Sequence, residues 1–374
     1  MTEFVLCIII ARRSSKGRRI GIEENSVLQE LIAILPEWFA LCARDLPWRR
    51  DREPYHVWLS EIMLQQTRVE AVKAYYTRFL EAVPDLDALA ACDPELLHKL
   101  WEGLGYYSRV RNLQAAARRI QEEYHSVFPR SLEAVRALKG VGDYTAGAIC
   151  SICFDLPTPA VDGNVLRVLS RLREDDRCTD DAAVRREIRS ELAAVYPLSG
   201  AGTITQALME LGATVCVPNG TPHCEQCPMA KRCAAHKNGS WTRYPVRAEK
   251  KARRSELLTV FVLNCGGTYA IRKRPETGLL AGLWEFPNVP GHLPLQEALD
   301  TAERWGVRPN APEQIRVRTH IFTHIRWEMR CYYLRCSERA AGFVWAQPNE
   351  LEQVYALPTA FRMFRENGAA DTID

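Results

Sequence analysis

Two acidic residues have surroundings that suit a proton donor and a neighbouring anion. Glu61 lies in a mainly apolar stretch beside Ile62 and Leu64, and Asp162 stands two residues before Asn164 at a predicted helix start. A carboxyl group buried among apolar side chains has a raised pKa, which a proton donor needs at neutral pH. One protonated and one ionised carboxyl group together can cleave a glycosidic bond. The plainer alternatives are a solvated helix face for Glu61 and an N-cap for Asp162 or Asn164.

A group of cysteines indicates a metal site. Their spacing is C-x7-C-x2-C-x5-C, and the residues are Cys216, Cys224, Cys227 and Cys233. Four thiolates can hold zinc or an iron–sulfur cluster. A structural zinc site usually has two C-x2-C pairs, and only one is present, so the spacing favours the bulkier cluster. The alternative is a set of inert buried cysteines. A bound cluster would act as a scaffold for the loop that carries Lys231 and Arg232.

A short glycine turn separates two predicted helices. Leu138-Lys139-Gly140-Val141-Gly142 joins them, and glycine allows the positive φ and the close backbone approach that such a turn needs. The amides at the start of the second helix favour an anion, so the hairpin can grip a DNA phosphate without reading the base sequence. Taken alone, the same residues also fit an ordinary helix connection.

The composition bounds the class of protein. The 374 residues predict two or three domains, and 47% hydrophobic residues suffice for a large core. The formal net charge of +3 says little about partners, and 13 scattered cysteines favour a reducing compartment over a disulfide framework. An apolar run at 4–11 precedes basic residues, the reverse of a secretory signal, and is too short to span a bilayer. We therefore expect a disordered extension at 1–24 and a cytoplasmic, nucleoid-associated protein.

The elements that must position these residues are helical in the first part of the chain. Apolar residues recur at helical spacing from about Val27 to Cys233. A capping box of Thr67 and Glu70 predicts a helix start, which places Gln66 at the turn between two helices. The remaining predicted helices cover Val57–Leu64, Leu132–Leu138, Tyr144–Phe154 and a segment that follows Asp162-Gly163-Asn164.

The pattern changes after a basic segment at 243–255, which reads as an exposed linker. Beyond it, β-prone runs predict strands at Leu257–Leu263, Tyr269–Ile271 and Met329–Leu334. We accordingly predict a mostly α domain at 25–242, which includes the cysteine loop at 216–233, and a separate α+β domain at 256–374.

Several stretches together resemble the endonuclease III-like superfamily, the helix-hairpin-helix DNA glycosylases, over roughly 36–233. The order of hairpin, aspartate and four-cysteine loop is similar, and within the superfamily the chain resembles MutY-type adenine glycosylases. The matching segments are Leu46-Pro47-Trp48-Arg49, Pro54 to Thr67 (PYHVWLSEIMLQQT), Gly103 to Arg109 (GLGYYSR) and Val161 to Val165 (VDGNV).

The resemblance implies a role for individual residues. Glu61 would protonate the adenine ring, Asp162 would stabilise the sugar cation or its covalent adduct, and Asn164 would orient the chemistry. Gln66 and Tyr106 would enter the base stack that the extruded adenine leaves. The implied DNA- and base-binding residues are Trp48, Arg49, Leu64, Gln66, Tyr106, Gly140, Gly142 and Gln206. The four cysteines would bind a [4Fe-4S] cluster, the one cofactor implied.

One position separates reaction types within the superfamily. Bifunctional relatives place a lysine two residues after the second hairpin glycine, where it forms a Schiff base, and this chain has Tyr144 there. We therefore count Tyr144 among the catalytic residues and expect a monofunctional enzyme in which water completes the reaction. A bifunctional lyase acting on oxidised pyrimidines and a non-catalytic iron–sulfur DNA-binding protein are the alternatives.

The C-terminal part is similar to the Nudix fold. Gly282-Leu283-Trp284-Glu285-Phe286-Pro287 resembles MutT, but the acidic Nudix box is missing, which implies recognition without hydrolysis. Phe322, Thr323 and His324 resemble the loop that reads 8-oxoguanine opposite adenine, with ordinary hairpin packing as the alternative. The expected partner is therefore double-stranded DNA with an A·8-oxoguanine or A·G mispair, bound by a monomer.

Three positions depart from the family pattern. The first cysteine gap is seven residues instead of six, Lys139 replaces a proline of the hairpin, and Thr323 replaces a serine but keeps the hydroxyl. The lysine would add a phosphate partner to the hairpin.

Overall fold

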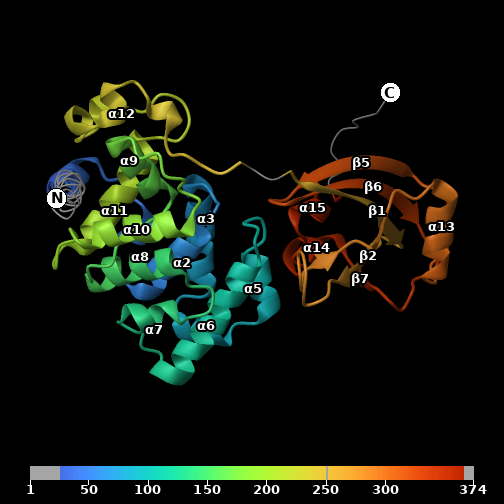
Figure 1. The fold of residues 1–374 in the computed structure, drawn as a ribbon. Helices are drawn as coiled ribbons and strands as arrows, with labels where there is room; N and C mark the ends of the chain where they lie inside the picture. The colour runs from blue at the N-terminus through green and yellow to red at the C-terminus, as the bar shows by residue number, and fades with distance from the viewer. Residues whose placement is uncertain (1–25, 250–251, 366–374) are drawn as a thin grey trace, which may run out of the picture. The chain divides into compact units, whose positions relative to one another are not determined.

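The computed structural model describes residues 26–249 and 252–365, which form two compact units (Figure 1). Among these residues, the first unit comprises 26–77 and 116–249, and the second comprises 78–115 and 252–365. Residues 78–115 thus group by contacts with the C-terminal part, although the sequence places them in the helical domain. The chain boundaries at 25–242 and 256–374 stay predictions, and the extension at 1–24 lies outside the described residues.

The first unit is helical. Residues 26–42 form its first described helix. The elements that follow are η1 (Pro47–Arg49), α2 (Pro54–Met63), α3 (Val69–Ala82), α6 (Ser108–Tyr124), α7 (Leu132–Arg136), α8 (Asp143–Phe154), α9 (Gly163–Arg173), α10 (Ala182–Ala193), α11 (Ala201–Glu210), η2 (Leu211–Val215, a π-helix), η3 (Cys224–Gln226), η4 (Ala230–Arg232), α12 (Ala234–Lys237) and η5 (Trp241–Arg243). Helices α3 and α6 each continue from one unit into the other.

The helices predicted from the sequence are present with small shifts at their ends. Helix α3 begins at Val69, so Thr67 belongs to the preceding turn rather than to a cap. Gln66 lies in that turn with φ 61°, as the prediction of a break between two helices requires. Helix α9 begins directly after Asp162, and its apolar residues Val165, Val168, Leu169 and Leu172 are buried.

The core of the first unit packs α9 against α11 and the helix at 26–42. Val165 and Leu169 of α9 meet Leu31, Leu35 and Leu208 in one buried cluster. Their removal from water supplies roughly 1.5–3 kcal/mol per large side chain, so this contact holds the start of α9 in place. The residue that begins α9, Asp162, is thereby positioned by apolar packing.

A glycine allows α9 and η2 to approach closely. A Cβ atom at Gly212 would lie 2.5 Å from the Cβ of Asn164, closer than packed atoms can come. The Gly212 carbonyl accepts a hydrogen bond from Arg167 Nη2 at 2.7 Å, which joins the two elements. The C-terminal end of α11 is consequently held beside the start of α9.

The second unit contains a mixed sheet of seven strands among its described residues. Its elements are α4 (Leu86–Ala91), α5 (Pro94–Leu100), β1 (Arg254–Cys265), β2 (Thr268–Lys273), β3 (Trp284–Glu285), β4 (Asn288–Pro290), α13 (Leu295–Arg304), β5 (Gln314–Ile321), β6 (Ile325–Arg335), β7 (Val344–Ala346), α14 (Pro348–Gln353) and α15 (Thr359–Arg362). The strand order is β3-β2-β1-β6-β5, with β4 paired to β1 and β7 to β2. Strands β1 and β6 run parallel, with Leu258 opposite Met329.

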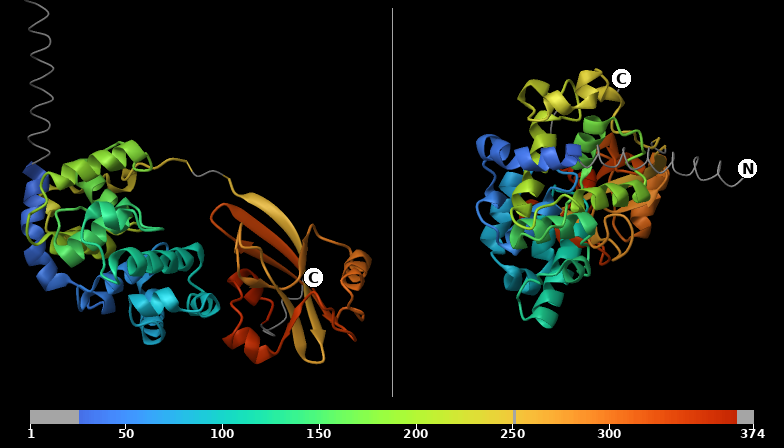
Figure 2. Two further views of the ribbon diagram at one scale, coloured as in Figure 1. Left: turned by 90° about the horizontal axis from the view of Figure 1, so that it is seen from below. Right: turned by 60° about the vertical axis from the view of Figure 1, so that its left-hand side comes forward.

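Strand β1 is buried on both faces. Val260 and Val262 belong to the core on the side of α14 and α15, and Phe261 and Leu263 belong to the core on the side of α13. Figure 2 (left) shows the strands between α13 and the pair α14 and α15. This burial on both sides explains why the middle of β1 is mainly apolar and does not alternate with polar residues. Among the described residues, no helix has the length and apolar character needed to cross a membrane.

Candidate active site and cysteine loop

A cavity of about 680 Å³ lies in the first unit and is lined by η1, α2, α8, α9 and α11. It gathers nine of the residues predicted from the sequence: Trp48, Arg49, Glu61, Leu64, Gln66, Tyr144, Asp162, Asn164 and Gln206. These residues span almost 160 positions of the chain, so the fold, and not local sequence, brings them together. Glu61 and Asp162 line the same cavity, as a reaction that uses both carboxyl groups requires.

Glu61 has the environment of a buried acid. Helix α2 packs against α8 through Val57 and Ala148, which turns Glu61 toward Tyr144, and the Tyr144 hydroxyl donates a 2.6 Å hydrogen bond to Glu61 Oε2. The residue is only 6% exposed. Burial raises the pKa of Glu61 to about 7, and the negative charge of Asp162 also raises it, while the Tyr144 hydrogen bond and the charge of Arg49 oppose the shift. Glu61 is therefore poised to give up a proton near neutral pH.

Asp162 is held as a hydrogen-bond acceptor at the start of α9. Its Oδ1 accepts the Val165 N–H at 2.8 Å and its Oδ2 accepts Asn164 Nδ2 at 2.7 Å. Burial raises the pKa of Asp162, and these two donors together with the charge of Arg167 oppose the rise. The N-cap interpretation is confirmed, and the capping carboxylate also lines the cavity.

Sequence reasoning missed several charged residues of the cavity. Glu210, Arg44, Arg185 and Arg247 also line it. The guanidinium of Arg247 lies near Gly163, since a Cβ atom built there would be 3.9 Å from Nη2, and the Arg247 segment is fixed because Thr179 donates two hydrogen bonds to Val246 O. In the sequence, the only feature that marks Arg247 is its place in the basic segment at 243–255. Nothing in the sequence marks Glu210 as the partner of Arg44.

The hairpin glycines lie away from this cavity. Gly140 has φ 80°, and Gly142 is the N-cap of α8. Both are exposed, and a Cβ atom at Gly142 would meet no atom within 4 Å. Asp143, the first residue of α8, pairs with Arg136 at 2.7 Å and with Arg189 at 2.7 Å. The glycine that precedes α8 is thus exposed, and the side chain of Asp143 is held by two arginines.

The second unit gathers the remaining predicted residues. Tyr106, Phe322, Thr323 and His324 line one cavity of about 460 Å³. Tyr106, which is 45% exposed, adopts φ 47°, and its hydroxyl is hydrogen-bonded to the Thr323 hydroxyl. Phe322 packs edge-on against Trp327, which ties the loop at 322–324 to the sheet. Residues from the GLGYYSR segment and from the C-terminal loop therefore share one site within this unit.

The four predicted cysteine ligands surround one small cavity in the first unit, next to Arg171. Arg171 Nη1 lies 3.4 Å from Cys216 Sγ, so the guanidinium lies beside this thiol, and Cys233 Sγ lies 3.4 Å from the backbone oxygen of Arg171. In the described part of the chain, no group of three or more His, Cys, Asp or Glu residues is arranged to hold a single metal ion.

Comparisons with known proteins agree with this architecture. Residues 59–193 match the HhH-GPD superfamily of base excision DNA repair proteins, and residues 259–367 match the NUDIX domain. A thermostable thymine-DNA glycosylase has a similar fold, with a TM-score of 0.51 and 24% sequence identity over 57% of this chain and 98% of that chain.

Two relatives extend over most of the sequence. Adenine DNA glycosylase of Rattus norvegicus is 33% identical over 89% of this chain and 77% of its own length. Adenine DNA glycosylase of Schizosaccharomyces pombe is 34% identical over 88% of each chain. The first family match includes Glu61 and Asp162, and the second covers most of the sheet. The chain belongs to the family of adenine DNA glycosylases.

Proposed function

We propose that the chain hydrolyses the N-glycosidic bond of adenine that is mispaired with 8-oxoguanine or guanine in double-stranded DNA. The observation that carries the proposal is the buried Glu61, which is hydrogen-bonded to Tyr144 and shares one cavity with Asp162. Base excision needs an acid that protonates the leaving base and an anion that stabilises the cationic sugar. The cavity supplies one residue for each task.

The chemical sequence follows from these two residues. Adenine leaves the base stack and enters the cavity, whose wall includes Trp48, Arg49 and Gln206. Glu61 transfers its proton to the adenine ring, and the bond between the ring nitrogen and C1′ breaks with its electron pair going to the base. Asp162 stabilises the positive sugar. Water then adds to C1′, and its released proton restores Glu61.

The absence of a lyase step is part of the proposal. A Schiff base needs a neutral amine near C1′, and Tyr144 occupies the position where bifunctional relatives have lysine. Among the described residues that line the cavity there is no lysine. Borohydride should therefore trap no covalent adduct with DNA, and efficient trapping would favour a bifunctional enzyme.

Recognition of the opposite base is assigned to the second unit. Thr323 and His324 are exposed polar residues on a loop that Phe322 anchors, and Tyr106 lies beside them as an exposed aromatic side chain. A hydroxyl and an imidazole can hydrogen-bond a base edge, and an exposed tyrosine can stack in place of a lost base. This arrangement supports reading of 8-oxoguanine opposite the extruded adenine.

The cysteine loop is proposed to hold a [4Fe-4S] cluster. Cys216, Cys224, Cys227 and Cys233 would supply thiolates, and the Arg171 guanidinium beside Cys216 would offset their negative charge. The cluster would supply a rigid scaffold for the loop with Lys231 and Arg232, and we assign it no part in the chemical step.

Binding to DNA is proposed to begin with phosphate contacts. The first candidate phosphate ligand is the hairpin with Gly140 and Gly142, through the amides at the start of α8, and it would bind without reading the base sequence. The second candidate is the loop with Lys231 and Arg232. We propose that the enzyme works as a monomer on chromosomal DNA in the cytoplasm.

The test is a cleavage assay on duplexes that carry A opposite 8-oxoguanine, G or C, with alkali added to break the abasic strand. We expect cleavage of the first two duplexes and little of the third. Glu61→Gln should abolish cleavage, whereas Glu122→Gln, a matched change at an exposed position of α6, should not. Full activity of Glu61→Gln, or inactivity of the cluster-loaded wild type on all duplexes, would refute the proposal.

A further inference from the structure

A fully buried carboxylate lies in the wall of the active-site cavity. Glu210 is the last residue of α11, and its side chain is 0% exposed. Its Oε1 accepts the Arg44 Nε at 2.7 Å and the Arg44 backbone N–H at 3.1 Å, and its Oε2 accepts Arg44 Nη2 at 2.8 Å and Arg49 Nη2 at 2.8 Å. Four hydrogen bonds from two arginines thus converge on one carboxylate.

This carboxylate is ionised at any working pH. Burial alone would raise the pKa of Glu210, but the hydrogen bonds from Arg44 and Arg49 bring it down to about 2. The group therefore carries a constant negative charge next to two constant positive charges, which leaves the triad one net positive charge. Charge-assisted bonds of this kind also fix geometry, because the planar guanidinium of Arg44 is held at two of its nitrogens.

The triad faces the proton donor. Arg49 lines the cavity together with Glu61, and its positive charge lowers the pKa of Glu61. The other groups that act on Glu61 are the Tyr144 hydroxyl on α8 and the Asp162 carboxylate at the start of α9. A nearby cation favours the ionised form of an acid, and a nearby anion favours the protonated form. An uncompensated pair of arginines at this wall would therefore favour the ionised form of the acid that must donate.

We propose that Glu210 is a positioning residue, whose carboxylate holds Arg44 and Arg49 at the cavity wall and offsets their charge so that Glu61 keeps its proton. The inference rests on the proposed role of Glu61. The inference adds one requirement to that role: part of the positive charge of the arginines at the cavity wall must be neutralised.

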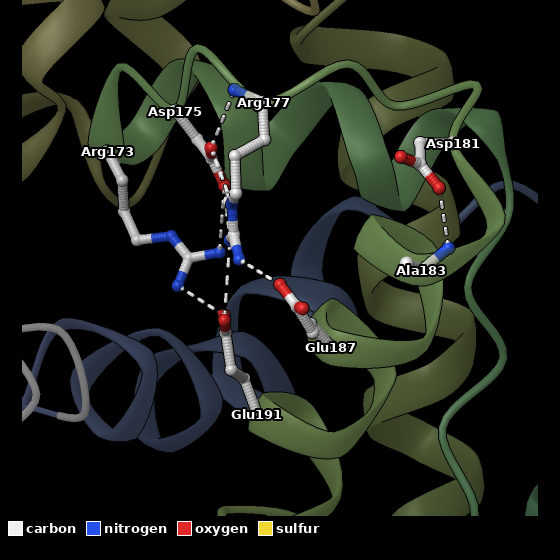
Figure 3. Close-up of polar contacts among 7 residues, drawn as sticks. All are labelled: Arg173, Asp175, Arg177, Asp181, Ala183, Glu187 and Glu191. Atoms are coloured by element: carbon white, nitrogen blue, oxygen red, sulfur yellow. Dashed lines mark hydrogen bonds and ion pairs between the residues drawn. The ribbon is translucent and has the colours of Figure 1, made fainter.

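A second ion cluster, which is partly buried, provides a control. Asp175, whose side chain is 10% exposed, accepts hydrogen bonds from Arg177 Nε at 2.9 Å and Nη2 at 2.6 Å, and Arg173, Glu187 and Glu191 complete the cluster (Figure 3). None of these five residues lines the cavity with Glu61. Loss of a charge at Asp175 should thus destabilise the fold without acting on the proton donor.

The experiment compares pH profiles of single-turnover adenine excision by the cluster-loaded full chain. Glu210→Gln should move the alkaline limb of the pH–rate profile to lower pH. If the limb moves by one pH unit, activity at pH values above the limb falls about tenfold. Glu210→Asp keeps the charge and should restore the limb toward its wild-type position. Arg44→Gln removes one positive charge and should move the limb to higher pH. Asp175→Asn should lower the melting temperature and leave the limb unchanged.

Opposite displacements for Glu210→Gln and Arg44→Gln, with none for Asp175→Asn, would support the inference. A Glu210→Gln profile that superimposes on the wild type or on Asp175→Asn would overturn it. If Glu210→Gln does not fold, the Arg44→Gln variant decides the question. An alkaline limb of Arg44→Gln that stays in place or moves to lower pH contradicts charge compensation. Undiminished activity of Glu61→Gln would instead refute the proposed function itself, so the two failures are distinct.

Discussion

Replacing Glu61 by glutamine is expected to stabilise the fold at alkaline pH while it abolishes activity. Burial raises the pKa of Glu61 from its ordinary 4.5 to about 7. Between these pH values the folded chain keeps a proton that the unfolded chain has lost, so the free energy of unfolding falls as the pH rises. Each pKa unit corresponds to about 1.4 kcal/mol, so the ionised group costs the fold about 3 kcal/mol above pH 7 and nothing below pH 4.5.

Glutamine removes this cost and keeps the shape of the side chain. Its carbonyl can still accept the hydrogen bond from Tyr144, while burial of the new amide costs about 1 kcal/mol. The net gain of about 2 kcal/mol near pH 8 corresponds to a melting temperature raised by about 4–8 °C for a unit of this size. Melting curves of wild type and Glu61→Gln at about pH 5 and about pH 8 would measure the gain.

The test compares the change in melting temperature caused by Glu61→Gln at the two pH values. The gain should be present near pH 8 and should shrink or reverse near pH 5, where Glu61 is protonated and without penalty. Glu122→Gln, on an exposed position of α6, should show no gain at either pH. Equal effects at both pH values, or a lower melting temperature of Glu61→Gln near pH 8, would refute the reasoning that burial raises the pKa of Glu61.

Three further perturbations test neighbouring parts of the site. Tyr144→Phe removes a hydrogen bond to Glu61 that favours the carboxylate, so the alkaline limb of the pH–rate profile should move to higher pH by about one unit. A limb that stays in place or moves to lower pH would contradict Glu61 as the proton donor. Arg247→Ala should lower the salt dependence of DNA affinity by about one charge, whereas Arg308→Ala, an exposed arginine of the second unit, should leave it unchanged. Thr323→Ala should reduce the preference for A·8-oxoguanine over A·G by about fivefold, the equivalent of one hydrogen bond, in single-turnover assays; an unchanged ratio would separate Thr323 from base reading.

The helical active site was largely predictable from the sequence because its parts are marked locally. Asp162 could be placed at a helix start because glycine and an apolar face follow it, and the structure confirms it as the N-cap of α9. Strand β1 was predictable for a similar reason, since burial on both faces leaves a run from Leu258 to Leu263 in which only Thr259 is polar. The break at Gln66 follows from the end of one apolar stripe before the next begins.

Long-range pairing of charges was not predictable. Glu210 and Arg44 lie 166 residues apart, and no local pattern links a carboxylate in an amphipathic helix to a distant arginine. The same holds for the grouping of 78–115 with the C-terminal part, which depends on contacts such as the bond from Trp284 Nε1 to Glu95 at 2.9 Å. The burial of Glu61 was open from the sequence as well, because α2 is apolar on most of its sides and only tertiary packing decides which side faces solvent.

The two acids of the cavity differ in the number of donors that face them, and this difference assigns their roles. Asp162 accepts an N–H from the backbone of α9 and another from Asn164, so its negative form is hydrogen-bonded before any substrate arrives. Glu61 accepts one hydroxyl proton, and its remaining surroundings are mainly apolar. When both groups compete for a single proton, the less solvated carboxyl group holds it. We therefore propose Glu61 as the donor and Asp162 as the anion that a positive sugar would meet.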